Sequence, residues 1–137
     1  MGSVLLKEAN MHQNYKNLIV WQKSMELVVQ VYKLTENYPS SELYGLTSQS
    51  RRCSVSIPSN IAEGRRRGGD VKFYRFFSIA FASASELETQ IEIAKRLPLG
   101  KKLDFSNVDS LLDEVMKMLN KLIQKNKFSG YLLNANY

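Results

Sequence analysis

The chain has very few of the side chains from which disulfides, metal sites and catalytic triads are built. Its 137 residues include one cysteine, Cys53, and one histidine, His12. A single cysteine excludes an internal disulfide, which fits a reducing cytoplasm. One cysteine and one histidine cannot complete a zinc site, and a histidine-based triad would have to use His12 near the N-terminus. The sequence therefore predicts no metal, no cofactor and no catalytic residue, and hence no enzyme.

Long apolar runs are missing as well. No stretch of about 18 apolar residues occurs, so no transmembrane helix is predicted. The N-terminal residues lack the apolar core of a signal peptide, and Leu6 stands where N-myristoylation requires Ser or Thr. We therefore expect a cytoplasmic protein with no membrane partner. Residues 1–14 would be a mobile lead-in, residues 15–126 one folded domain, and residues 127–137 a C-terminal tail.

Apolar residues recur at helical intervals in three segments. The intervals alternate between three and four residues, which places one apolar stripe along one face of each helix. The stripes are Leu18, Trp21, Met25, Val28 and Tyr32; Phe73, Phe77, Ala80, Ala84, Leu87, Ile91 and Ala94; and Val108, Leu112, Val115, Leu119 and Leu122. No alternation with a period of two is sustained, so we predict no sheet.

A further helix, second in chain order, is predicted from a weaker pattern. Its inward side chains would be Leu46, Ser50, Cys53, Ile57 and Ile61, several of which are small. Pro58 has no N–H group for the Ser54 carbonyl, so this helix either bends there or divides into two short helices at Ile57. Because the connections are short, the sequence predicts an all-α fold, an antiparallel up-down-up-down four-helix bundle with helix two kinked at Pro58.

Two of the predicted helices carry more apolar surface than one inward stripe needs. The additional side chains are Val20, Leu27, Val31 and Leu34 on the first helix, and Phe76, Ile79 and Phe81 on the third. Helices that are apolar over most of their circumference are buried on two sides. We expect the second side to contact another subunit of a homo-oligomer. The alternative is a wide core stripe within a monomer.

Positive charge is concentrated in one part of the sequence. Residues 51–75 hold seven basic residues against Glu63 and Asp70, a net charge of +5 out of a total of +6. The seven are Arg51, Arg52, Arg65, Arg66, Arg67, Lys72 and Arg75. Such a local excess is typical of a surface that binds a polyanion, the alternative being a solvated surface that keeps the protein soluble.

These basic residues have different expected surroundings. Three consecutive arginines, Arg65–Arg67, are predicted in the loop between helices two and three, without ion-pair partners. Arg51 and Arg52 either extend the basic surface along the bundle or pair with acidic side chains of helix three, Glu86 or Glu88. The tip of the bundle is therefore predicted to be its most positive region.

Several short motifs resemble those of one family. They are Val20–Gln22, Tyr44–Thr47, Arg51–Arg52, Ser56–Gly64 and Glu86–Gln90. Over about residues 18–122 the chain resembles the four-helix-bundle proteins encoded by intervening sequences in 23S ribosomal RNA genes, also described as ribosomal-protein-like. That family is similar to the accessory variability determinant of diversity-generating retroelements, a pentameric barrel that binds nucleic acid and a reverse transcriptase.

The resemblance implies a ring-like homo-oligomer, with a pentamer expected, and RNA or DNA as a partner. It also implies a reverse transcriptase or another protein as a partner, although most members have no established biochemical activity. Together with the charge pattern, it predicts a non-enzymatic scaffold that binds the nucleic-acid backbone through the seven basic residues. The alternative is an adaptor that binds an acidic protein and has no nucleic-acid role.

Overall fold

The structure, a computed structural model, describes the backbone of residues 14–67 and 70–135 and the side chains of residues 15–67 and 71–125. Its long helices are α2 (Ile19–Thr35), α3 (Ser48–Arg67), α4 (Asp70–Arg96) and α5 (Ser106–Ala135). Short turns join or precede them: η1 (Asn14–Asn17), η2 (Ser40–Glu42), η3 (Leu43–Thr47) and η4 (Pro98–Gly100). The described residues contain four long helices and no strand, which confirms the all-α prediction.

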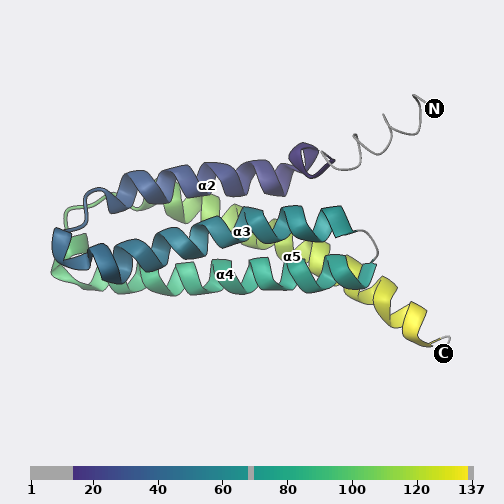
Figure 1. The fold of residues 1–137 in the computed structure, drawn as a ribbon. Helices are drawn as coiled ribbons and strands as arrows, with labels where there is room; N and C mark the ends of the chain where they lie inside the picture. The colour runs from purple at the N-terminus through teal and green to yellow at the C-terminus, as the bar shows by residue number, and fades with distance from the viewer. Residues whose placement is uncertain (1–13, 68–69, 136–137) are drawn as a thin grey trace, which may run out of the picture.

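The four long helices lie side by side as a bundle (Figure 1). Both α2 and α4 pack against α3 and α5. The α2–α3 and α4–α5 connections lie at the left-hand end in Figure 1, and the end of α3 lies beside the start of α4 at the right-hand end. Helix α5 continues to Ala135, so residues 127–135 of the expected C-terminal tail are helical. Of the expected lead-in, residues 1–14, residues 1–13 lie outside the described residues and Asn14 begins η1.

No helix in the part of the chain that the structure describes is both long and apolar enough to cross a membrane.

The core confirms two of the three predicted stripes. In α4 the stripe is buried from Phe77 to Ala94, and in α5 from Val108 to Leu119. The predicted inward residues of α3 from Ser50 to Ile61 are also buried, while Leu46, in η3, is half-buried. These helices therefore turn the expected faces inward.

The stripe predicted for α2 is wrong as its core face. The buried residues of α2 are Val20, Ser24, Leu27, Val31, Leu34 and Thr35. Met25 and Tyr32, from the predicted stripe, are 41% and 40% exposed. The predicted stripe and the buried stripe have the same alternating spacing of three and four residues. The buried stripe contains the polar Ser24, whose hydroxyl donates a hydrogen bond to the Trp21 carbonyl at 2.7 Å and therefore needs no other partner in the core. Helix α2 thus turns its serine-containing stripe inward and leaves an apolar stripe near the surface.

Helix α3 passes through Pro58 without ending. It is one helix from Ser48 to Arg67, so the alternative of two short helices divided at Ile57 is wrong. Polar side chains bond to backbone carbonyls on both sides of the proline: Ser59 Oγ donates to the Val55 carbonyl at 2.8 Å, and the Asn60 amide donates to that of Ser56 at 2.8 Å. These bonds support the backbone near the N–H that proline lacks.

The three consecutive arginines lie in the last turn of α3 and not in a loop, which corrects the prediction. Gly64 does not end the helix. It is buried against α4, where a Cβ atom would lie 2.9 Å from Phe76 Cβ and 3.1 Å from Phe77 Cδ1. The last turn is further held by Arg67, whose Nε lies 2.7 Å from Glu63 Oε1 one turn earlier. The glycine therefore allows close helix packing, and the arginines that follow continue the helix.

Candidate nucleic-acid interface

The structure separates the seven predicted basic residues into two groups. Arg65–Arg67 end α3, and Lys72 and Arg75 lie near the start of α4 at the same end of the bundle (Figure 1). Arg51 and Arg52 lie in the first turns of α3, about 14 residues or roughly 21 Å away along the helix axis. All seven are exposed except Arg51, which is half-buried. The first group is called the basic end below.

Two arginines of the basic end have partners, contrary to the prediction. Arg67 pairs with Glu63, and its guanidinium lies 5.8 Å from the centroid of the Phe76 ring. The guanidinium of Arg66 lies 4.9 Å from the centroid of the Tyr15 ring, and its Nη2 donates to the Tyr15 hydroxyl at 3.1 Å. Of these partners only Glu63 is charged. The contacts therefore orient the arginines while leaving most of their positive charge uncompensated.

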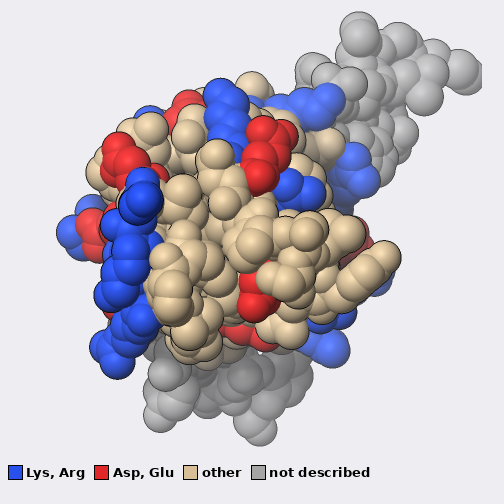
Figure 2. Space-filling model, turned by 90° about the vertical axis from the view of Figure 1, so that its left-hand side faces the viewer, with Lys and Arg blue, Asp and Glu red and all other residues tan. Residues whose placement is uncertain are grey.

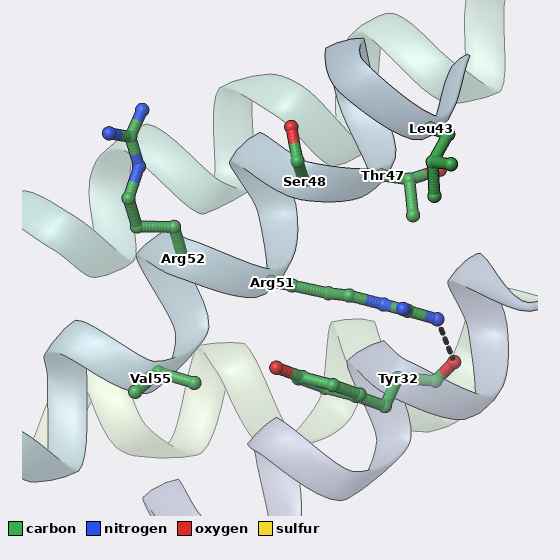
Figure 3. A pocket seen from close by; sticks show the side chains of 7 residues that line it. All are labelled: Tyr32, Leu43, Thr47, Ser48, Arg51, Arg52 and Val55. Carbon is green, nitrogen blue, oxygen red and sulfur yellow. Dashed lines mark hydrogen bonds between the residues drawn. The ribbon is translucent and has the colours of Figure 1, made fainter. Parts of the chain in front are cut away.

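Arg51 lies at an open pocket of about 400 Å³ between the end of α2 and the start of α3 (Figure 3). The lining residues are Tyr32, Leu43, Thr47, Ser48, Arg51, Arg52 and Val55. The Arg51 guanidinium stacks on the Tyr32 ring at 4.5 Å from its centroid, as Figure 3 shows. Its Nε donates to Thr35 Oγ1 at 2.9 Å, and its Nη2 donates to the Tyr32 carbonyl at 3.4 Å. A cation at the end of α2 also complements the helix dipole.

The alternative partners proposed for this pair, Glu86 and Glu88, are not used. Among the residues described, no ion pair joins either glutamate to Arg51 or Arg52. The Arg52 side chain points away from Tyr32 in Figure 3 and is exposed. Arg52 therefore remains available to an external anion, whereas Arg51 is held by the end of α2.

A second open hollow of about 470 Å³ follows the same two helices. It is lined by Tyr15, Trp21, Met25, Val28, Val55, Pro58, Ser59, Ala62, Glu63 and Arg66. Val55 lines both hollows, so the two adjoin, and together they are called the α2–α3 groove. Sequence reasoning missed this groove. Its signal was nevertheless present, because the stripe that was assigned to the core of α2 supplies one wall of the groove.

One pocket on the other side of the bundle is mainly acidic. A pocket of about 330 Å³ between α4 and α5 is lined by Glu88, Ile91, Glu92, Lys95, Asp109, Leu112 and Asp113. Lys95 Nζ lies 2.7 Å from Asp109 Oδ2, and this hydrogen bond raises the pKa of Lys95. The end of the bundle at the connections is mixed in sign, since Figure 2 shows Lys and Arg side chains along one edge and acidic side chains at several places. Positive charge therefore predominates at the basic end and along the adjoining groove.

The one cysteine, Cys53, is a buried thiol. Burial raises the pKa of the Cys53 thiol, and a hydrogen bond with Glu86 raises it further. Gln90 Nε2 lies 3.5 Å from Cys53 Sγ. Such a thiol is a poor nucleophile. Within the described ranges, no group of three His, Cys, Asp or Glu residues is placed to hold a metal ion.

One comparison with known proteins identifies the family. Among curated proteins, none matches the chain. The model of the family described as 23S rRNA-intervening sequence protein matches residues 16–121. This range holds α2, α3 and α4, all seven basic residues and nearly the whole lining of the groove. The chain therefore belongs to the 23S rRNA-intervening sequence protein family.

Proposed function

We propose that this protein is a non-enzymatic, homo-oligomeric scaffold of the cytoplasm that binds the backbone of RNA or DNA through its basic surface. The basic end carries the proposal. Arg65–Arg67, Lys72 and Arg75 are exposed on adjacent turns of two packed helices, and Glu63 is the one described acidic residue paired with them. Lys and Arg side chains on a rigid support bind phosphates with little dependence on sequence.

Exposed apolar side chains outside the groove support assembly into an oligomer. Ile19 and Val29 on α2, and Val71 and Ile93 on α4, are between 43% and 62% exposed. They provide apolar positions on two helices at which subunits could contact each other. We propose a ring, with five subunits as the family resemblance implies, because a ring would place several copies of the basic end on one particle.

The proposed subunit is an up-down-up-down bundle with a bend at Pro58. Contacts at both ends of α3 support opposite directions for α2 and α3. Arg51, near the start of α3, contacts the end of α2, whereas Arg66, at the end of α3, contacts Tyr15 just before α2 begins. Only two residues separate the end of α3 from the start of α4, and the opposite directions of these helices place Arg75 back beside α3, which assembles the basic end.

A charge-removal experiment tests the nucleic-acid role. Arg65, Arg66 and Arg67 would be replaced by alanine together, and binding of labelled RNA and DNA measured by fluorescence anisotropy at several salt concentrations. We expect the variant to bind all sequences more weakly to a similar degree. The slope of log affinity against log salt concentration should become shallower, by about 0.7 to 0.9 for each phosphate that the variant no longer neutralises. Circular dichroism would check that the fold is retained.

The matched control removes the same charge from the other end of the bundle. Arg96, Lys101 and Lys102 are exposed there, and their replacement by alanine should change affinity and salt dependence much less. Equal effects of the two triple variants, or none from the first, would reject the basic end as the binding surface. Binding of polyglutamate in place of RNA would favour the alternative function, an adaptor for an acidic protein.

A further inference from the structure

The α2–α3 groove points to a more specific ligand than a phosphate backbone. Resting on the proposed nucleic-acid role, we infer that this groove holds unpaired bases of a single-stranded RNA or DNA segment, whose phosphates contact the arginines at its rim. The basic end alone would bind any polyanion. The groove adds a surface on which flat apolar groups can stack.

The walls of the groove provide the apolar surface. On α2 they are Trp21, Met25, Val28 and Tyr32, and on α3 they are Val55, Pro58 and Ala62. Three of these, Met25, Tyr32 and Val55, are about 40% exposed. Pro58 is buried and Trp21 packs against the edge of the core, but α2 builds its core with its other face and leaves Met25 and Tyr32 exposed. The walls therefore form an apolar strip at the surface, and such strips mark binding sites.

An arginine stacked on a tyrosine stands at each end of the groove. Arg51 lies on Tyr32 at one end, and Arg66 lies on Tyr15 at the other. Trp21 extends the second pair, since its ring meets that of Tyr15 edge to face with 5.4 Å between centroids. A guanidinium placed over one ring can stack on a nucleobase with its opposite face, and hydrogen bonds hold both guanidinium groups in place.

The groove combines positive charge with apolar walls. A nucleic acid matches both, whereas an acidic partner matches only the charge and a neutral apolar partner only the walls. Arg52 is exposed at one end and Arg65 stands near the other. Glu63 is the one acidic residue in the lining, and it is paired with Arg67. The roughly 21 Å between the two ends suits about four nucleotides, the short end of single-strand site sizes. The apolar walls would contact the bases, and the arginines at the two ends would contact the phosphates.

Base pairing should exclude a nucleic acid from this groove. In a duplex each base is stacked between its neighbours, so that its faces cannot reach the tyrosines. Only unpaired bases can lie against side chains in this way. The inference therefore separates two sites, the basic end for any nucleic acid and the groove for single strands.

Trp21 provides a direct measurement, because it is the only tryptophan of the chain and lines the groove. Intrinsic fluorescence of the full chain would be followed during titration with oligouridine of about 12 nucleotides and with a duplex of equal phosphate number. We expect the single strand to quench or shift the Trp21 emission, and the duplex to leave it nearly unchanged although it binds.

A matched pair of variants tests the groove itself. Ala62→Glu places a carboxylate in the groove wall, and should weaken oligouridine binding by about tenfold or more while duplex binding falls much less. Ala82→Glu makes the same change at an exposed position of α4, outside the groove, and should leave the preference for single strands intact.

The outcomes separate the two proposals. If nucleic acid binds and the triple arginine variant weakens it, but Trp21 emission does not change and Ala62→Glu has no effect, the groove inference is wrong and the proposed function stands. If neither probe binds, both are wrong. If Trp21 emission depends on protein concentration alone and Ala62→Glu reduces the particle mass, the groove is an interface between copies, which also overturns the inference.

Discussion

At both Gly64 and Gly45 there is no room for a Cβ atom, but the atoms that it would meet are different. At Gly64 the backbone of α3 approaches α4 so closely that a side chain would meet Phe76 and Phe77. At Gly45, inside η3, φ is −111° and ψ is −115°, and a Cβ atom would lie 2.6 Å from Glu42 Oε2. That carboxylate accepts a hydrogen bond from the Leu46 amide at 3.0 Å and so supports the turn before α3. Both glycines therefore fix where α3 begins and how closely it packs.

Gly64→Ala should destabilise the protein. Replacing glycine by alanine inside a helix normally stabilises by about 0.5–1 kcal/mol, because the unfolded chain has less freedom to lose. Here the new methyl group would overlap Phe76 Cβ, which is fixed to the backbone of α4. We expect a net loss of about 1–3 kcal/mol in the free energy of unfolding, measured by urea denaturation. Gln49→Ala, at an exposed position of α3, is the control and should change it by less than about 0.5 kcal/mol; a more stable Gly64→Ala variant would contradict the packing account.

Among the helices, α4 and α5 could be predicted from the sequence and the orientation of α2 could not. The stripes predicted for α4 and α5 are their buried faces, from Phe77 to Ala94 and from Val108 to Leu119. Helix α2 has two stripes of equal spacing, and the buried one is interrupted by Ser24. Hydrophobicity alone favours the other stripe, because it contains Trp21, Met25 and Tyr32. The choice depends on tertiary packing, which leaves the aromatic stripe beside α3.

For the candidate site, too, the sequence could identify the residues but not how the helices bring them together. Charge counting located all seven basic residues, but it could not show that Arg66 and Arg51 would each stack on a tyrosine from outside α3. Those pairs depend on which face of α2 meets α3. The loop assigned to Arg65–Arg67 was wrong because a glycine reads as a helix end, whereas its burial against α4 is visible only in three dimensions.

Pro58→Ala tests the bend proposed for α3. Alanine would supply the N–H group that the Ser54 carbonyl lacks and would remove the ring that crowds it. We expect the free energy of unfolding to rise by about 1–2 kcal/mol, less than the full cost of a proline inside a helix because the ring is itself buried. In contrast, Pro39→Ala, in the α2–α3 connection, should lower the free energy of unfolding by up to about 1 kcal/mol, because proline there restricts the unfolded chain. A loss at Pro58 would show that α3 already accommodates the proline without strain.

At the scale of the whole molecule, the basic surface and an acidic pocket lie at different places on the bundle. The groove and the basic end are positive, and the pocket between α4 and α5 has four acidic residues around Lys95. A subunit of this kind orients in the field of a polyanion, so that the α2–α3 side faces it and the α4–α5 side turns away. In a ring of such subunits, all positive faces could be directed to one nucleic acid.

Light scattering tests the assembly. At micromolar concentration we expect a particle of several times 15.7 kDa, and five times for the proposed pentamer. Val71→Glu or Val29→Glu should lower the mass without loss of helix content, because each places a charge on an exposed apolar face that we assign to subunit contacts. Ser110→Glu, at an exposed polar position of α5, should leave the mass unchanged. A monomer mass throughout the concentration range would exclude the oligomer.

The segment Ser56–Gly64 carries three separate constraints on evolutionary change. Ile57, Ile61 and Gly64 are held by the core. Ser56 Oγ shares a hydrogen bond of 2.8 Å with Ser83 Oγ on α4, and the Asn60 amide donates to Ser56 Oγ at 3.0 Å. The other four positions, Pro58, Ser59, Ala62 and Glu63, line the groove. If the groove binds a single strand as inferred, a lineage that lost this ligand would keep the first five residues and drift at Ser59, Ala62 and Glu63, whereas Pro58 is also constrained by its burial. The substitutions found in relatives thus distinguish a working groove from an abandoned one.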